Sequence, residues 1–226
     1  MAFLVLLFLI FACLGPAQDN AQTLLREAQA NLNDGHYSNA IKLATSAADQ
    51  FRRSGDQAGL IRALTDVGLG QLYSGDYPPA LKTFTDARDL SKRVNDREYE
   101  ITSLSNIGTI RHLTGRYSEA MDAYRDAAAL ADSAAPAPWL ASRRQLVVAN
   151  TAILYQTLGQ YDRALALYNR LLDSKQALAP REQAQLLANM GVLRRRLGIL
   201  KRRSPLTAKH RLYTVRLGIA MERFQS

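Results

Sequence analysis

The side chains that most often perform catalysis or hold metals are few and widely separated in this sequence. The 226 residues contain three histidines, His36, His112 and His210, and one cysteine, Cys13. A nucleophile needs a neighbouring base and an oxyanion hole, and a metal site needs several ligands at short spacing. The sequence has no G-x-S-x-G, phosphate-binding glycine loop or paired metal-ligand motif. It predicts a protein that is not an enzyme and carries no cofactor or metal.

A different set of polar residues recurs regularly along the chain. At five places a polar residue stands two positions before a small residue within an apolar run. An amide side chain both donates and accepts a hydrogen bond, so it can pair with the main chain of an extended peptide whatever the peptide's side chains. These positions therefore form a candidate binding column. The column consists of Arg26, Asp66, Asn106, Asn150 and Asn189.

The column belongs to an internal repeat. Four segments share a glycine, a tyrosine two residues later, an alanine three further and then a large apolar or aromatic residue: Gly35–Ala47, Gly75–Ala87, Gly115–Ala127 and Gly159–Leu171. An apolar run precedes each glycine, and a fifth run ends at Gly198. Apolar residues recur at steps of three and four, the helical period. Each glycine is predicted to end a first helix. The second helices are predicted to begin at Tyr37, Tyr77, Tyr117 and Tyr161.

Small residues recur at one point of each helix and would let a neighbouring helix approach closely. In the first helices they are Ala28, Gly68, Gly108, Ala152 and Gly191, and in the second helices Ala40, Ala80, Ala120 and Ala164. The aromatic residues Phe84, Tyr124 and Tyr168 are predicted to fill the space beside them as core. Pro136 and Pro138 predict a longer loop before a helix that opens near Trp139.

This combination of small, glycine, tyrosine, alanine and aromatic positions resembles the tetratricopeptide repeat family. The resemblance covers residues 21–198 and implies an all-α fold, a right-handed superhelical α-solenoid of stacked antiparallel helix pairs with about four and a half repeats. The alanine spacing is 40, 40 and 44 residues, against roughly 34 in the common unit. In their greater length the units are similar to those of kinesin light chain and of bacterial proteins that join such repeats to a CHAT peptidase-like domain.

The resemblance implies that the first helices line a concave groove whose polar side chains hold a peptide or protein segment. A non-enzymatic interaction scaffold with a protein ligand and no small-molecule substrate is therefore favoured. In the alternative for the site, Asn106, Asn150 and Asn189 bond to adjacent helices and stabilise their stacking. In the alternative for the function, the chain is the regulatory amino-terminal part of a peptidase-like protein with a CHAT domain. The predicted groove adds these neighbours of the column: Arg62, Thr102, Thr109, His112, Gln156 and Arg195.

The net charge of +9 resides in the last part of the chain. Residues 194–226 contain ten basic residues and one acidic residue, so the rest is balanced and a nucleic-acid partner would depend on this tail. The repeat pattern stops after Gly198, and an exposed apolar end is expected near Leu193–Leu197. Residues 199–226 are interpreted as a nucleic-acid or membrane-surface segment, a degenerate capping helix, or the product of a reading-frame error. The last is favoured, because restoring one base after the Gly198 codon restores the alanine and aromatic positions.

Residues 1–17 have the features of a signal peptide. The apolar core from Ala2 to Leu14 is shorter than the roughly 20 residues of a membrane-spanning helix, and Gly15-Pro16-Ala17 provides small residues for cleavage after Ala17. We expect export to the periplasm or the extracellular space. In the alternative, Cys13 carries a lipid anchor in the envelope, so membrane contact would occur only through this leader.

Overall fold

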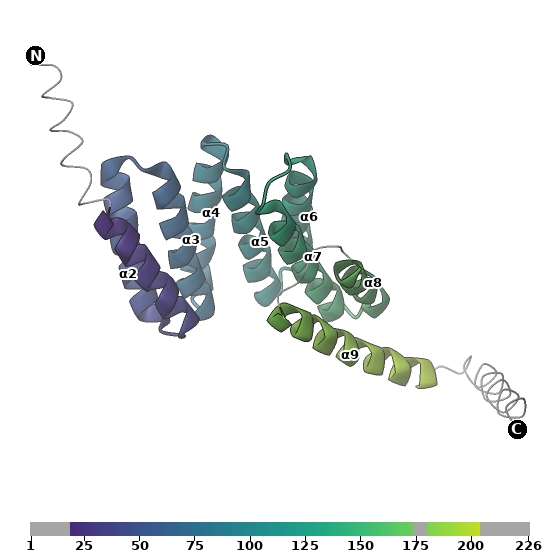
Figure 1. Ribbon diagram of the computed structural model, residues 1–226. Helices are drawn as coiled ribbons and strands as arrows, with labels where there is room; N and C mark the ends of the chain where they lie inside the picture. Colours follow the sequence, from purple (N-terminus) through teal and green to yellow (C-terminus); the bar gives the residue numbers. More distant parts are fainter. Residues whose placement is uncertain (1–18, 174–179, 204–226) are drawn as a thin grey trace, which may run out of the picture. The chain divides into compact units, whose positions relative to one another are not determined.

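The chain is all-α in the computed structural model, which describes residues 19–173 and 180–203 (Figure 1). This part of the chain contains helices, turns and loops and no strand, as the sequence predicts. After a helix at residues 19–33, the helices are α2 (Tyr37–Ser54), α3 (Gln57–Tyr73), α4 (Tyr77–Arg93), α5 (Arg97–Leu113), α6 (Tyr117–Ser133), α7 (Leu140–Thr157), α8 (Tyr161–Leu172) and α9 (Pro180–Arg203).

Contacts divide the chain into two compact units, one up to Leu154 and one from Tyr155, so that the division falls within α7. In the first unit α2 packs against α3, α3 against α4, α4 against α5, and α5 against α6. The first helices α3 and α5 also contact each other directly. The first unit is therefore a solenoid of consecutive helix pairs. In the second unit α8 packs against α9.

Short turns that contain a left-handed residue reverse the chain from the first helix to α6 and between α7 and α8, whereas the connection from α6 to α7 is a longer loop without such a residue. Gly115, with a φ of 77°, lies between α5 and α6, and there the Arg116 N–H donates to the Arg111 carbonyl oxygen at 2.7 Å. Glycine suits this conformation because it has no Cβ. All four predicted second-helix tyrosines begin helices. The other glycines with positive φ are Gly35, Gly55, Gly75 and Gly159, and Asn95 takes this conformation between α4 and α5.

The fifth apolar run departs from the predicted pattern. The turn expected at Gly198 does not form, and α9 continues to Arg203. Ile199, Leu200 and Lys201 do not break a helix, and no tyrosine stands two residues after Gly198 to begin a second helix. Within the range Leu193–Leu197, where an exposed apolar end is expected, Leu193 is instead fully buried and Leu197 is half-buried.

Close contacts between glycines and aromatic rings hold the core of the first unit together. A Cβ added at Gly68 would lie 2.8 Å from the ring of Phe84, and one at Gly108 would lie 2.5 Å from the ring of Tyr124. Both rings are buried. In the preceding repeat the corresponding pair is Ala28 and Ala44, which pack in one buried cluster. The prediction that small residues admit a neighbouring helix, and that Phe84 and Tyr124 fill the core beside them, is confirmed.

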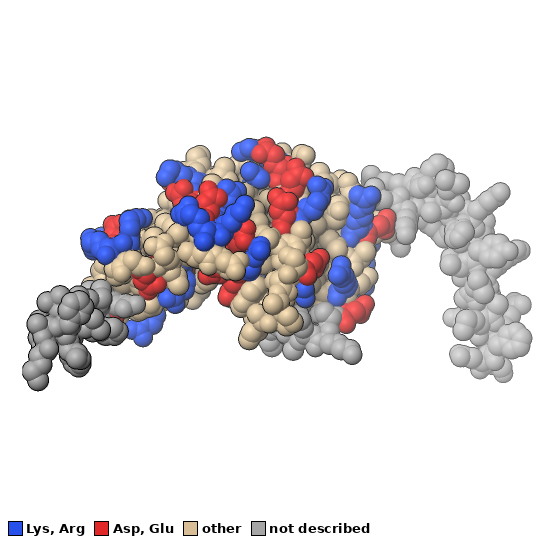
Figure 2. Space-filling model, turned by 90° about the horizontal axis from the view of Figure 1, so that it is seen from above, with Lys and Arg blue, Asp and Glu red and all other residues tan. Residues whose placement is uncertain are grey.

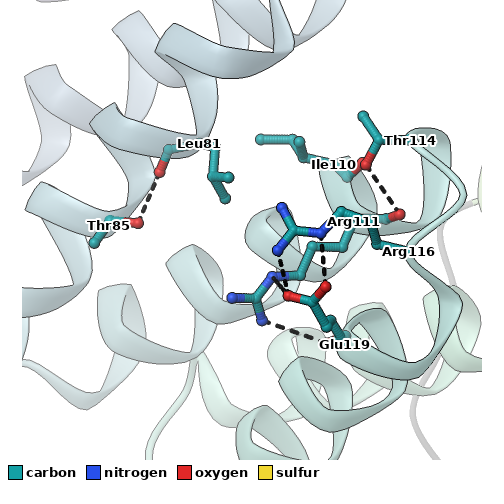
Figure 3. A network of polar contacts seen from close by, with 7 residues as sticks. All are labelled: Leu81, Thr85, Ile110, Arg111, Thr114, Arg116 and Glu119. Atoms are coloured by element: carbon teal, nitrogen blue, oxygen red, sulfur yellow. Dashed lines mark hydrogen bonds and ion pairs between the residues drawn. The ribbon is translucent and has the colours of Figure 1, made fainter.

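Ion pairs centred on Glu119 join α5 to the first turn of α6 (Figure 3). The Arg116 Nε donates to Glu119 Oε1 at 2.7 Å. Arg111, in the last turn of α5, reaches Glu119 Oε2 at 3.6 Å and donates to the Glu119 carbonyl oxygen at 3.4 Å. A carboxylate in the first turn of a helix also interacts favourably with the helix dipole. These charges therefore fix the position of α6 along α5.

Candidate functional site

Polar side chains connect successive first helices of the first unit. Because these bonds run from residues 19–33 to α3 and from α5 to α7, the first helices present one shared polar face. Its members include several of the predicted site residues. The bonded pairs are Gln29 with Asp66, Glu98 with Arg143 at 2.8 Å, and Thr109 with Asn150 at 3.5 Å.

Asp66 is a buried carboxylate on this face. Asp66 is 6% exposed, and its Oδ2 atom has no hydrogen-bond partner among the described residues. Burial raises the pKa of Asp66 to about 6, and the hydrogen bond with Gln29 and the charge of Arg62 offset part of this rise. Asp66 is therefore largely ionised at neutral pH, although its surroundings favour the neutral form.

Asn106 is the member of the column whose amide remains available. It follows Asp66 on the next first helix and is half-buried, and it has no side-chain hydrogen-bond partner within the described part of the chain. The neighbouring Thr102, by contrast, donates to the Glu98 carbonyl oxygen of its own helix at 2.8 Å. Asn106 can therefore donate and accept bonds to a ligand without breaking a bond of the fold.

Thr109 and Asn150 take part in packing between helices. The Thr109 hydroxyl donates to the Ser105 carbonyl oxygen at 3.0 Å and lies 3.2 Å from the hydroxyl of Tyr124. Burial raises the pKa of Tyr124, and this hydrogen bond with Thr109 lowers it in part. Asn150 then bonds to the same threonine. For Asn150 the structure thus favours the stacking role over ligand binding.

Four predicted residues remain, and three of them lie outside the first unit. Gln156 and Asn189 belong to the second unit, where Asn189 hydrogen-bonds to Tyr168 of α8. His112, in the last turn of α5, is half-buried, and burial lowers its pKa. It is therefore a neutral side chain at physiological pH and adds no positive charge to the face. Arg195 is exposed on α9.

Tyr99, Glu98 and Arg143 also belong to the face, although the repeat pattern does not single them out. Burial and the charge of Glu98 raise the pKa of Tyr99, while the charges of Arg62 and Arg143 lower it. The phenol therefore lies among charges from three first helices. Glu98 and Arg143 are 45 residues apart in sequence, so their pairing depends on the stacking of α5 and α7. In the sequence, only their positions near the starts of α5 and α7 indicate that the two residues could pair.

Charges of both signs alternate over the surface seen in Figure 2, without a large area of one sign. The described residues contain no group of three or more histidine, cysteine, aspartate or glutamate side chains that could hold a metal ion. No helix in that same part is long and apolar enough to cross a membrane. The polar face of the first helices offers groups for hydrogen bonding and for packing against a ligand.

Comparison with known proteins agrees with this fold. Residues 74–133 match the profile of the family described as tetratricopeptide repeat. The structure is similar to the apo form of RapI, with a TM-score of 0.63, 16% identity and coverage of 78% of this chain and 48% of RapI. It is also similar to BtubC (BKLC) from P. vanneervenii, with a TM-score of 0.54, 16% identity and coverage of 82% and 84% of the two chains. No curated protein sequence matches the chain.

The fold and the match together define the class of the protein as a helical-repeat solenoid, and its repeats at residues 74–133 are tetratricopeptide repeats. This fold is typical of non-enzymatic interaction scaffolds. The chain spans about half the length of RapI. The likeness of its longer units to those of kinesin light chain and of CHAT-linked proteins stays a prediction.

Proposed function

We propose that this protein is an interaction scaffold that binds an extended segment of a partner protein across the shared face of α3, α5 and α7. The observation that carries the proposal is the unbonded amide of Asn106, on a face where the neighbouring Thr102 and Thr109 hydroxyls and the Asn150 amide make bonds within the fold. First helices α3 and α5 lie in direct contact, as elements on the inner side of a curved stack do. A ligand along this face would therefore meet side chains from consecutive repeats.

Main-chain recognition explains the residue types on this face. The Asn106 amide can donate to a ligand carbonyl oxygen and accept from a ligand N–H. Arg62 of α3, whose charge acts on Asp66 and Tyr99, supplies a charged donor to the same face. Tyr73 and Leu113, the last residues of α3 and α5, are 56% and 52% exposed and offer apolar contacts for ligand side chains. We expect the polar groups to fix the ligand backbone and the apolar groups to select among sequences.

Peptides selected from a displayed random library on the wild-type chain provide the test of this proposal. Asn106→Ala should weaken a selected peptide about tenfold, because each lost hydrogen bond leaves a ligand group unpaired. N-methylation of the peptide amide that bonds Asn106 should have a similar effect. The melting temperature should not change, since the Asn106 amide has no side-chain partner among the described residues. Titration calorimetry and thermal unfolding measure both quantities.

The matched control is Asn169→Ala, which removes an exposed amide from the second helix α8. It should leave the peptide affinity unchanged. Equal affinity of wild type and Asn106→Ala would contradict the proposed role of Asn106. If Asn106→Ala lowered the free energy of unfolding by as much as it lowered the free energy of binding, Asn106 would instead be assigned to helix stacking.

We further propose that the scaffold acts outside the cytoplasm, on the basis of its leader sequence. Residues 1–18 lie outside the described part of the chain, so this proposal depends on sequence alone. In a bacterial host, a fusion to a reporter phosphatase that folds only after export should be active, and the mature chain should begin at Gln18. Retention of residues 1–17 on an intracellular, inactive fusion would contradict export.

A further inference from the structure

Helix α9 has one buried side and one open side. Leu186, Met190 and Leu193 are 6%, 1% and 0% exposed and form the buried side. Leu187 is 49% exposed, and a Cβ added at Gly191 would meet no atom within 4 Å. Residues four apart lie on the same face of a helix. Leu187 and Gly191 thus belong to a single open surface of the second unit.

The corresponding surface of α5 is covered by a helix. Leu104 and Gly108 occupy the same two positions in α5 that Leu187 and Gly191 occupy in α9. Leu104 is 8% exposed, and the ring of Tyr124 from α6 lies so close to Gly108 that an added Cβ would be 2.5 Å from it. The glycine of α5 therefore admits an aromatic ring from the next helix. In α9 the same space is open.

A charged position of α5 also recurs in α9. Arg111 stands three residues after Gly108 and pairs with Glu119 of α6 at 3.6 Å (Figure 3). Arg194 stands three residues after Gly191 and is exposed, as is the adjacent Arg195. The open surface of α9 therefore has the same two features by which α5 holds α6, a space for an aromatic ring and a nearby arginine.

We infer that the open side of α9 binds an acidic amphipathic helix of a partner protein. An aromatic ring of that helix lies over Gly191, and a glutamate five residues earlier pairs with Arg194, as Tyr124 and Glu119 do on α5. The exposed arginines favour an acidic occupant. A symmetric contact with α9 of a second copy would instead bring the same arginines together. This surface belongs to the second unit, whereas α3 and α5 of the proposed peptide-binding face belong to the first.

A peptide with the sequence of residues 117–133, stapled as a helix on its outer side, is the probe for this surface. It should bind the full chain saturably in a fluorescence-anisotropy titration. Either of two substitutions in the peptide should weaken binding about tenfold. Tyr124→Ala removes the ring that contacts the glycine, and Glu119→Lys replaces the ion pair by a repulsion. These substitutions concern only the synthetic peptide, so the folding of the protein is unaffected.

Two variants of the protein locate the binding site on α9. Gly191→Ala should weaken the probe about tenfold without lowering the unfolding midpoint, because the free protein has no atom near the new Cβ. Arg194→Glu should weaken the wild-type peptide and regain affinity for the Glu119→Lys peptide. Such charge-reversal rescue would not arise from a purely structural effect of either change.

Three results would overturn the inference. The wild-type chain could fail to bind the probe saturably. Gly191→Ala could bind the probe as well as wild type does, which would place the peptide elsewhere, for example in exchange with α6 on α5. Sedimentation could show a dimer that Gly191→Ala converts to a monomer, in which case a second copy of the chain occupies the surface.

Discussion

Replacing Gly108 by alanine is expected to lower the free energy of unfolding by about 2 kcal/mol, although alanine is otherwise the better helix former. The new Cβ would lie 2.5 Å from Cε1 and 2.8 Å from Cδ1 of Tyr124. That ring is 2% exposed and its hydroxyl lies 3.2 Å from the Thr109 Oγ1, so it has little freedom to move. The helices α5 and α6 must separate instead. Chemical denaturation of wild type and variant measures the difference.

The matched control is Gly191→Ala, at the corresponding position of α9. Because no atom lies within 4 Å of the added Cβ, only the better helix propensity remains, and stability should stay constant or rise by about 0.5–1 kcal/mol. In a Tyr124→Ala background, Gly108→Ala should also cease to destabilise, since two alanines reproduce the Ala28–Ala44 pair. If Gly108→Ala costs the same with and without the ring, the close packing of glycine against Tyr124 is not the cause.

Asp66→Asn is expected to stabilise the protein at pH 7.5 and to leave its stability nearly unchanged at pH 4. The pKa of Asp66 is raised from 3.8 to about 6 in the folded state, mainly by burial. The contribution of Asp66 to stability is therefore highest below pH 3.8 and falls as the pH rises through 6, because the folded state then loses a proton that it holds more tightly than the unfolded state. Above pH 7 the ionised carboxylate costs about 2–3 kcal/mol, which asparagine avoids.

Asp122→Asn provides the comparison for this pH dependence. Asp122 is exposed on α6 and pairs with Arg125 at 3.1 Å, and exposed pairs contribute roughly 0–1 kcal/mol. Its replacement should change stability little at either pH. Unfolding midpoints in urea between pH 4 and pH 8 give the full profile. A gain from Asp66→Asn that is independent of pH, or a loss at pH 7.5, would contradict a destabilising buried charge at Asp66.

The cost of Asp66 also bears on function. The corresponding position is asparagine in three other first helices, at Asn106, Asn150 and Asn189. A carboxylate that lowers stability where an amide would fit is the kind of residue that binding sites retain. Asp66 therefore supports the assignment of its face as the ligand-binding face, independently of the free amide of Asn106.

Most of the fold follows from local sequence patterns. Tyr117 begins α6 because Gly115 takes the left-handed conformation that ends α5, and both residues are visible in the sequence. The small and aromatic positions predict the close approach of Gly108 and Tyr124, since both are fixed by their distance from the turn. Such features depend on residues near one another in the chain, and the repeat presents them several times.

The details of the site could not be predicted in the same way. The burial of Asp66 depends on the neighbouring helices, and the pair of Glu98 and Arg143 forms between helices that start 43 residues apart. The stacking role of Asn150 depends on the position of Thr109 across the interface. In each case the sequence identifies a polar residue on a helical face. Its partner is set by the offset between neighbouring helices.

The most direct test of the account is a crystal structure of the chain with a library-selected peptide. We predict that the peptide main chain lies across α3, α5 and α7 and that its amide and carbonyl groups are within hydrogen-bonding distance of the Asn106 side chain. A peptide bound to the outer helices α4 and α6, with the Asn106 amide still unbonded, would contradict the proposed scaffold function of this face.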